Sequence, residues 1–557
     1  MKKMRGAIVR FLCCVAAVGG MFWFDLPAIN LRNQGFWSFV VKSIIVCAVI
    51  IGIGGVWRFI KSKLHGGAEV VDGKAVFSNG KRMLKSAALP VKAVLITVVG
   101  IILLSLLMSL IGARIFNAKR YASLIETTNG DFATDVAELS MSQIPVVDRD
   151  TATRLGQRKL GEMSDLVSQF EIEDDYTQIN YKDRPTRVTP LKYADFIKWC
   201  TNSAEGIPAY IAVDLTTQEV DLVRLSDLGL GNIRYSGSEY FLRNVNRALR
   251  FKYPTKIFGS VSFEIDEKGT PYWVASVIQY KIGLWSGPDI CGVVLMDATT
   301  GESNYYALAD IPQWVDQAYD ENMLFRQLTD NGLLKNGYWN SLFGQKGCVM
   351  PTDGYNYLAI DDDVWMYTGI TSVTADESNI GFVLVNLRTK EARYYVQAGA
   401  EEYSAMDSAR GQIQEKNYTA TFPILLNVGG RPTYFMSLKD SAGLVKMYAF
   451  VDMEQYQIVG TGTSVDKARE AYLSMLADEK IETDTEVIEQ VSEEVGVVTA
   501  LASAVVDGNT QYYVKMSGKE SIVVLPASIS NELPFLKVGD TLTVFYTNGK
   551  PTSVTIG

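Results

Sequence analysis

Residues Leu295 to Leu308 read LMDATTGESNYYAL, in which an apolar run ends at Asp297 and a Thr-rich turn leads into a second β-prone run. A short polar side chain at the first position of such a turn can accept hydrogen bonds from backbone amides two and three residues further on. The stretch therefore predicts a hairpin corner. A metal-binding or catalytic Asp297 is the alternative interpretation.

The same pattern recurs in AVDLTTQEVDLV, LVNLRTKEARYY and FVDMEQYQIVGT. Successive corners are about 83, 89 and 66 residues apart, a spacing typical of small domains rather than of a solenoid. We expect these turn residues to be structural. They are Asp214, Asp297, Asn386 and Asp452.

The segments before two of the corners share an order of helix, hairpin and strand. The residues GTPYWVASV with VVLMDATTGE, and GRPTYFMSL with YAFVDMEQYQIV, resemble the PepSY family of small extracytoplasmic α+β modules. The resemblance covers about 240–310 and 405–462, and the second copy lacks the Gly of the Asp-x-x-Thr-Gly-Glu corner. Membership would imply a role in restraining or modulating extracytoplasmic proteases.

Three apolar segments precede these modules, at about 7–24, 43–60 and 93–113. Each approaches or exceeds the ~20 residues that cross a bilayer, so the sequence predicts three membrane helices. The charged residues Arg10, Lys42 and Arg114 lie near segment ends, which favours an anchor over an ion path. A cleaved signal peptide is the alternative for the first segment, but the bulky MFWFDLP that follows favours its retention.

The distribution of charge predicts the orientation. The leader MKKMR and the loop 61–92 are rich in Lys and Arg, so the N-terminus is expected in the cytoplasm and residues 118–557 outside the plasma membrane. Residues 1–117 hold 15 basic and 3 acidic side chains, whereas residues 118–557 hold 38 basic and 59 acidic ones. A region this acidic is a poor candidate for binding nucleic acid or an anionic membrane.

The expected fold class is α+β, with three N-terminal transmembrane helices, several PepSY-like units and a small C-terminal β-barrel of the SH3 or OB type. The polar, helix-prone stretch 119–169 is expected to connect the membrane to the folded part. The predicted domains are a membrane anchor (1–117), a membrane-proximal α+β region (118–230), a PepSY-like unit (231–310), a β-rich α+β unit (311–399), a second PepSY-like unit (400–478), an acidic linker (479–490) and the barrel (491–557).

The chemistry available outside the membrane is restricted, because the only histidine is His65 in the predicted cytoplasmic loop. Ser-His-Asp, Cys-His and histidine-ligated zinc sites are therefore excluded there, and no phosphate-binding loop motif is present. A carboxylate pair acting on a glycan remains possible. An SxxK dyad at Ser464 and Lys467 is possible too, although a surface helix is the better interpretation. Cys200, Cys291 and Cys348 could form one disulfide, and the sequence does not choose the pair.

The acidic triplet Asp361, Asp362 and Asp363 is the strongest metal candidate, but it lacks the spacing of a calcium loop. No catalytic residue and no cofactor are expected. The sequence favours a non-catalytic, membrane-embedded binding, assembly or regulatory protein of the cell envelope, with a protein, peptide or cell-wall ligand and no nucleic acid. A carboxylate-dependent glycan hydrolase and an accessory subunit of a secretion or transport complex stay open, as does the oligomeric state.

Overall fold

The computed structural model describes residues 2–65, 70–71, 74–75, 78–139, 143–373, 378–479, 491–506, 509–518, 522–530, 532–547 and 550–557. Contacts divide the chain into two compact units, Met1–Glu482 and Thr483–Gly557. The predicted linker 479–490 lies outside the described residues except for Glu479.

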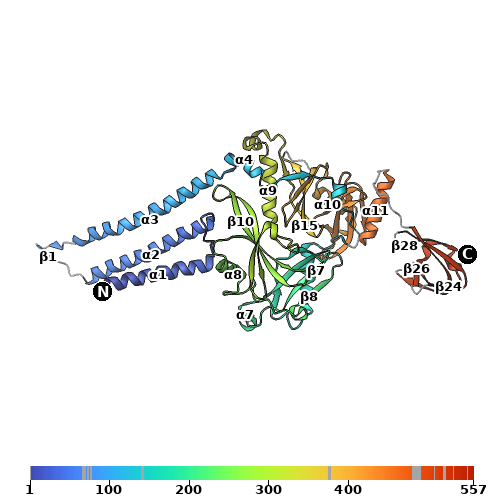
Figure 1. Ribbon diagram of the computed structural model, residues 1–557, viewed down its shortest axis with the longest axis horizontal. Coiled ribbons are helices and arrows are strands. Elements are labelled where there is room, and N and C mark those ends of the chain that lie inside the picture. Colours follow the sequence, from blue (N-terminus) through green and yellow to red (C-terminus); the bar gives the residue numbers. More distant parts are fainter. Residues whose placement is uncertain are drawn as a thin grey trace. The chain divides into compact units, whose positions relative to one another are not determined.

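Three long helices begin the chain: α1 (Lys2–Asp25), α2 (Gln34–His65) and α3 (Ser78–Ile111) (Figure 1). Within the described residues, each contains a stretch long and apolar enough to cross a membrane: Ala7–Asp25, Gln34–Gly52 and Ala93–Ile111. This confirms the three expected apolar helices. The loop between α2 and α3 carries a short strand pair, β1 (Val70–Val71) and β2 (Lys74–Ala75).

The second apolar helix differs from its predicted bounds, because α2 begins at Gln34 rather than near residue 43. Lys42 therefore lies inside the candidate span instead of at its end. Its Nζ is 2.9 Å from Oδ2 of Asp25, the last residue of α1. The charge of Lys42 is thus balanced by a carboxylate on the neighbouring helix.

The first helix-and-sheet unit follows α4 (Arg114–Ala122), β3 (Thr127–Asn129) and α5 (Phe132–Asp135). It consists of α6 (Arg149–Gly161), β4 (Phe170–Ile172), β5 (Thr177–Tyr181), β6 (Arg184–Tyr193), α7 (Phe196–Asn202), β7 (Ala209–Asp214) and β8 (Val220–Arg224). Ala152 and Leu160 of α6 are buried in the core. The stretch 119–169 also takes part in the fold, because α6 covers the first sheet and β3 pairs with a strand of the third unit.

The second and third units repeat this plan. The second has α8 (Val245–Lys252) and the antiparallel strands β9 (Ile257–Ile265), β10 (Pro271–Ile282), β11 (Ser286–Asp297) and β12 (Ser303–Ala307). The third has α9 (Glu321–Leu334), β13 (Val349–Pro351), β14 (Asn356–Ile360), β15 (Asp363–Ser372), β16 (Ser378–Asn386), β17 (Ala392–Tyr395) and β18 (Gly399–Ala400). In the third unit β17 also pairs in parallel with β3.

In the fourth unit, one helix precedes the strands in the sequence and a second helix follows them. Its elements are α10 (Glu402–Gly411), β19 (Thr419–Ala420), β20 (Ile424–Val428), β21 (Arg431–Lys439), β22 (Val445–Asp452), β23 (Val459–Gly462) and α11 (Val465–Asp478). The turn between β20 and β21 uses Gly429 and Gly430, both with positive φ (61° and 78°), as a tight antiparallel hairpin requires.

Each of the four predicted corners joins a central strand of its sheet to the next strand in the sequence (β7 to β8, β11 to β12, β16 to β17, β22 to β23). At Asp297, Oδ1 accepts from the backbone N–H groups of Thr299 (2.7 Å) and Thr300 (3.0 Å). The same two bonds, to residues i+2 and i+3, form at the other three corners. The hydrogen bonds expected from the sequence are therefore present at every corner.

The cores of these units are continuous with one another. One apolar cluster includes side chains from all four sheets, among them Ile211, Trp273, Tyr367 and Phe450. A second cluster joins α9 to the sheets on either side of it, so α9 lies between β10 and β15 (Figure 1). The four units therefore form one body rather than a string of separate domains.

The C-terminal unit is an antiparallel sheet with the strand order β26-β25-β24-β27-β28. Its strands are β24 (Val491–Val506), β25 (Asn509–Met516), β26 (Ile522–Pro526), β27 (Thr541–Thr547) and β28 (Lys550–Ile556). The long β24 pairs with β27 along its first half and with β25 along its second, which curves the sheet into a half-barrel around Val498, Leu525 and Leu542.

We expect substitutions at two of the corners to lower the free energy of unfolding by different amounts. Asp452 is fully buried and forms a two-bond ion pair with Arg431 (2.9 and 3.1 Å), whereas Asp297 is part-exposed and bonds only within its own turn. Asp452→Ala should lower the free energy of unfolding by about 3 kcal/mol because it leaves Arg431 without this partner. Asp297→Ala should cost about 1 kcal/mol. Denaturant titration of the full chain in detergent measures both, and equal losses would contradict this account.

Candidate functional site

The acidic triplet Asp361 to Asp363 is divided by the hairpin between β14 and β15. Asp361 and Asp362 are the two turn residues, with φ of 50° and 68°, and Asp363 begins the next strand. The carboxylate of Asp363 pairs with Arg388 (2.6 and 2.7 Å), while Asp362 Oδ1 accepts from Asn180 Nδ2 (2.9 Å). Across the described residues, no three His, Cys, Asp or Glu side chains gather in a way that could hold a metal ion.

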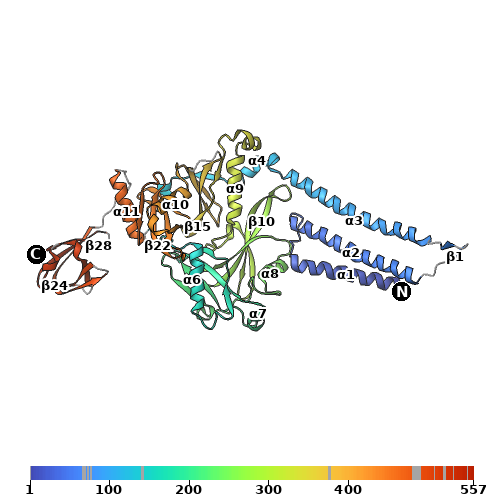
Figure 2. The same cartoon turned by 180° about the vertical axis from the view of Figure 1, so that it is seen from behind.

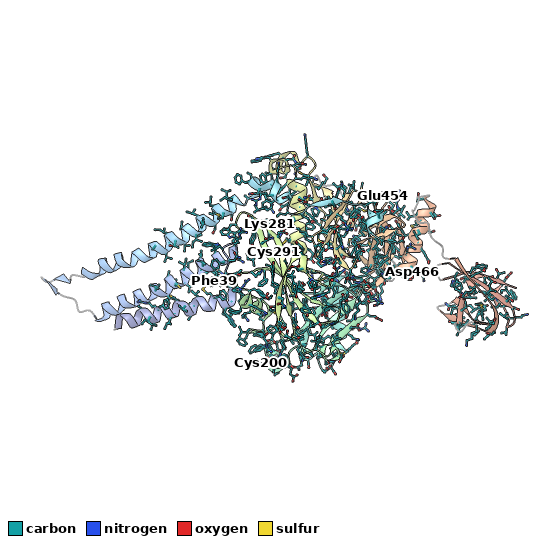
Figure 3. The ribbon with its side chains drawn as sticks, in the orientation of Figure 1. Phe39, Cys200, Lys281, Cys291, Glu454 and Asp466 are labelled. Carbon is teal, nitrogen blue, oxygen red and sulfur yellow. The ribbon has the colours of Figure 1, made fainter. Side chains whose placement is uncertain are left out.

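The other candidates from the sequence are also separated. Ser464 is the N-cap of α11, and its Oγ accepts from the backbone N–H of Lys467 (3.3 Å), a capping bond within the SxxK motif. All six cysteines are free, and Figure 3 shows Cys200 and Cys291 in different parts of the fold. The corner residues lie in the turns of four different sheets and form no common site; they are Asp214, Asp297, Asn386 and Asp452.

The four units instead meet around a cavity of about 510 Å³. Its lining comes from every unit and from the segment that precedes α6. Representative lining residues are Asp148, Gln178, Arg187, Ser262, Glu321, Tyr357 and Met436. This volume lies within the range of ~300–1,000 Å³ that is usual for small-molecule sites.

Arg187, on β6, is a lining side chain that forms no ion pair with the described residues. Only 7% of it is exposed, its Nη2 donates to Gln178 Oε1 (3.0 Å), and its Nε has no hydrogen-bond partner. No carboxylate lies within 4.0 Å of the guanidinium in the part of the chain that the structure describes. Burial accordingly lowers the pKa of Arg187 below its ordinary value. Burying a guanidinium without an ion pair costs free energy, and an anion that binds to it offsets this cost.

The buried and half-buried acids of the cavity, by contrast, already have partners. Burial alone would raise the pKa of Asp148, but its bonds from Lys439 and Thr151 hold that pKa below its ordinary value. Burial raises the pKa of Glu321, whose carboxyl group bonds the hydroxyl of Tyr357. Asp320 caps the N-terminus of α9 through Met323 N (3.1 Å). The acids of the lining nevertheless outnumber its two arginines, Arg149 and Arg187; they are Asp148, Asp150, Asp175, Asp320 and Glu321.

A buried pair of carboxyl groups lies beside the cavity. Asp316 N donates to Glu264 Oε2 (2.9 Å), and Asn180 N donates to Asp316 Oδ2 (2.7 Å). Both side chains are at most 1% exposed. Burial raises the pKa of Glu264 to about 7, and burial together with repulsion from Glu264 raises that of Asp316 well above its ordinary value. These groups join the first and second units to the segment that leads into the third.

The candidates predicted from the sequence did not include Arg187, Glu321 or the Glu264–Asp316 pair. Arg187 stands in the β-prone run RPTRVTPLKY, all of which is buried or half-buried except its first residue. A charge inside such a run was the available signal, but an isolated Arg in a strand is more often an edge residue. None of the protein-family models matches this chain, and neither does any curated protein.

The raised pKa of Glu264 predicts a pH dependence of stability. The unfolded chain loses this proton near pH 4.5 and the folded chain near pH 7, so stability should fall as pH rises through that window. The loss should be on the order of 3 kcal/mol. Glu264→Gln keeps an oxygen acceptor and should flatten the profile, leaving the contribution of Asp316. Denaturant titrations of both proteins at about pH 4.5, 6 and 8 measure the free energy of unfolding. Parallel pH profiles for the two proteins would contradict the prediction.

Proposed function

We propose that this chain is a membrane-anchored, extracytoplasmic binding protein of the cell envelope whose central cavity takes an anionic ligand. The observation that carries the proposal is Arg187, a buried guanidinium that lines the cavity without a carboxylate partner. Guanidinium groups bind carboxylates and phosphates through paired hydrogen bonds, and burial strengthens those bonds. A ligand anion would supply an oxygen partner for the Nε of Arg187, which has no hydrogen-bond partner among the described residues.

The ligand class that fits best is a short peptide or cell-wall fragment with a free carboxylate. Tyr355, Tyr357 and Phe422 provide ring surfaces in the lining, and Gln178, Gln317 and Ser437 provide polar contacts. Such a mixture suits a chain of amides and side chains better than a purely apolar molecule.

The proposed orientation places the N-terminus in the cytoplasm and residues 118–557 outside the plasma membrane. The basic leader and loop 61–92 support it. Contacts of the helix ends add support, since Ile29 N donates to Pro254 O (2.7 Å) and Arg114 pairs with Asp330 (2.6 Å). These contacts support a topology in which the α1–α2 loop and the end of α3 lie on the same side of the membrane as the sheets.

The proposal includes two finer assignments of fold, the PepSY-like units and the C-terminal SH3- or OB-like unit. A helix followed by an antiparallel sheet in each unit supports the PepSY-like assignment of 231–310 and 400–478. The curvature of β24 supports an SH3- or OB-like unit at 491–557. PepSY-like modules would suit a regulatory role toward extracytoplasmic proteases, with the cavity as the site of the regulating ligand.

A carboxylate-dependent glycan hydrolase is the second candidate. Glu321, with its raised pKa, and Asp148, with its lowered pKa, line the same cavity, and such a contrast is what an acid and base pair requires. Their existing bonds to Tyr357 and Lys439 favour binding over catalysis. Release of reducing sugar from cell-wall glycan by the purified chain, lost in Glu321→Gln, would favour the hydrolase.

The orientation predicts where reporters work. Alkaline phosphatase requires an oxidising compartment, so a fusion after residue 557 should be active and a fusion in the loop 61–92 inactive. Enzyme activity normalised to fusion level in whole cells measures this. Activity in the reverse pattern would place the sheets in the cytosol and reject the proposal.

Arg187→Met predicts loss of anion binding without loss of fold. Free-carboxyl tripeptides should bind the wild-type chain about 10- to 100-fold more tightly than their amidated forms, the range of one charge-assisted contact. Arg187→Met should abolish this difference while leaving the melting temperature equal or higher, because an uncompensated buried charge is removed. Arg184→Met, on the same strand but exposed and paired with Asp214, is the matched control. Native mass spectrometry reports binding, and equal affinity for both peptide forms would reject the carboxylate site.

A further inference from the structure

Three segments next to the ends of the apolar helices reverse the charge of the region they belong to. Residues 114–125, 240–263 and 331–352 hold ten basic side chains and no acidic one, whereas residues 118–557 as a whole hold 38 basic and 59 acidic side chains. The basic residues are Arg114, Lys119, Arg120, Arg243, Arg247, Arg250, Lys252, Lys256, Lys335 and Lys346.

Two of the segments adjoin an end of a candidate membrane span, and the third contacts the first of these two segments. Residues 114–125 continue directly from α3. In 240–263, the Phe251 ring lies 6.0 Å from that of Phe22 and the Arg247 guanidinium lies 4.4 Å from the Trp23 ring centre. In 331–352, Asn331 Nδ2 donates to Ala122 O (2.7 Å). Lys281, whose carbonyl accepts from Arg120 Nη2 (2.6 Å), adds a further cation at the nearby end of β10 (Figure 3).

Exposed apolar side chains accompany this basic charge. Trp339 and Phe343 are 61% and 80% exposed, and their rings stack at 5.9 Å. Their loop is held in shape, because Asn336 Nδ2 and Asn340 Nδ2 both donate to Lys346 O (3.0 Å each). Tyr240, Phe241 and Leu242 form a second exposed group, 45% to 61% exposed, beside Arg247, which donates to two of their carbonyls.

Aromatic rings beside Lys and Arg are typical of surfaces that lie at the headgroup level of a bilayer. We propose that the loop 335–347 and the segment 240–256 form a docking surface for anionic phospholipid headgroups of the bilayer that holds α1 to α3. Continuity with the three helices and complementary charge identify this occupant. The proposal rests on the membrane anchoring proposed above and adds a direct contact between the sheet region and lipid phosphate.

The docking surface can be tested with the full chain in nanodiscs of phosphatidylcholine, with and without phosphatidylglycerol. Amide hydrogen exchange in 335–347 and 240–256 should be slower in the anionic discs. Lys335→Glu with Lys346→Glu should reduce the protection of 335–347 by about fivefold for each lysine replaced, and leave 240–256 protected. The matched control is Arg158→Glu on α6, which is 81% exposed at its side chain and lies on a helix packed against the first sheet (Figure 2). This variant should exchange like the wild type.

The outcomes separate this proposal from the anchor on which it rests. A chain that does not co-elute with discs overturns the anchoring and the docking surface together. A chain that co-elutes but exchanges equally in both kinds of disc overturns the docking surface alone. Protection that is independent of lipid charge but rises with protein concentration assigns the surface to a second copy, and overturns the proposal as well.

Discussion

Both faces of the central antiparallel sheets are buried, and the arrangement of residues 1–482 depends on this constraint. In β10, Trp273, Ala275 and Val277 face the core shared with the first unit, while Val274 faces the core shared with α9 and the third unit. Antiparallel sheets commonly leave one face to solvent. Here a single helix cannot cover both faces, so each unit depends on its neighbours for the second one. The units consequently form one body, because no central sheet could bury both of its apolar faces without its neighbours.

The cavity follows from the same constraint. Apolar faces pack closely where two units meet, but four curved sheets cannot meet at one place without leaving space. The lining mixes apolar side chains such as Leu215 and Ile424 with polar or charged ones such as Arg187 and Glu321, and the buried carboxyl groups of Glu264 and Asp316 lie beside it. Apolar residues of suitable size could have filled the space at lower cost, since an unpaired buried charge is expensive. The buried guanidinium of Arg187 at this junction is the physical reason for proposing that the cavity is a binding site.

Local features of the fold could be predicted from the sequence, and long-range ones could not. The corners at Asp214, Asp297, Asn386 and Asp452 were predictable because each depends on hydrogen bonds within four consecutive residues. The three apolar helices were predictable from length and hydropathy. The role of α6 was not, because a helix that covers a sheet has the same pattern as a helical connector. The Asp361 to Asp363 triplet looked like one site, but a two-residue turn separated Asp363 from its neighbours, and a long-range Arg gave it a partner. Arg187 and Glu321 are 134 positions apart in the chain, and only the packing of units brings them to one cavity.

The net charge of residues 118–557 likewise does not predict how one part of this region interacts with a surface. The excess of acidic side chains in 118–557 predicts repulsion from an anionic surface only if every charge acts on that surface equally. At physiological ionic strength, charges are screened over about 8 Å, so the groups nearest a surface dominate its interaction with a protein. The segments 114–125, 240–263 and 331–352 hold ten basic side chains near the ends of the apolar helices, of which Arg114 and Arg243 pair with the flanking acids Asp330 and Glu239. A bilayer around those helices would therefore meet the basic segments first. In the proposed orientation, the overall acidity would repel the rest of the region from an anionic membrane, so both signs of charge would favour the same orientation of the sheets.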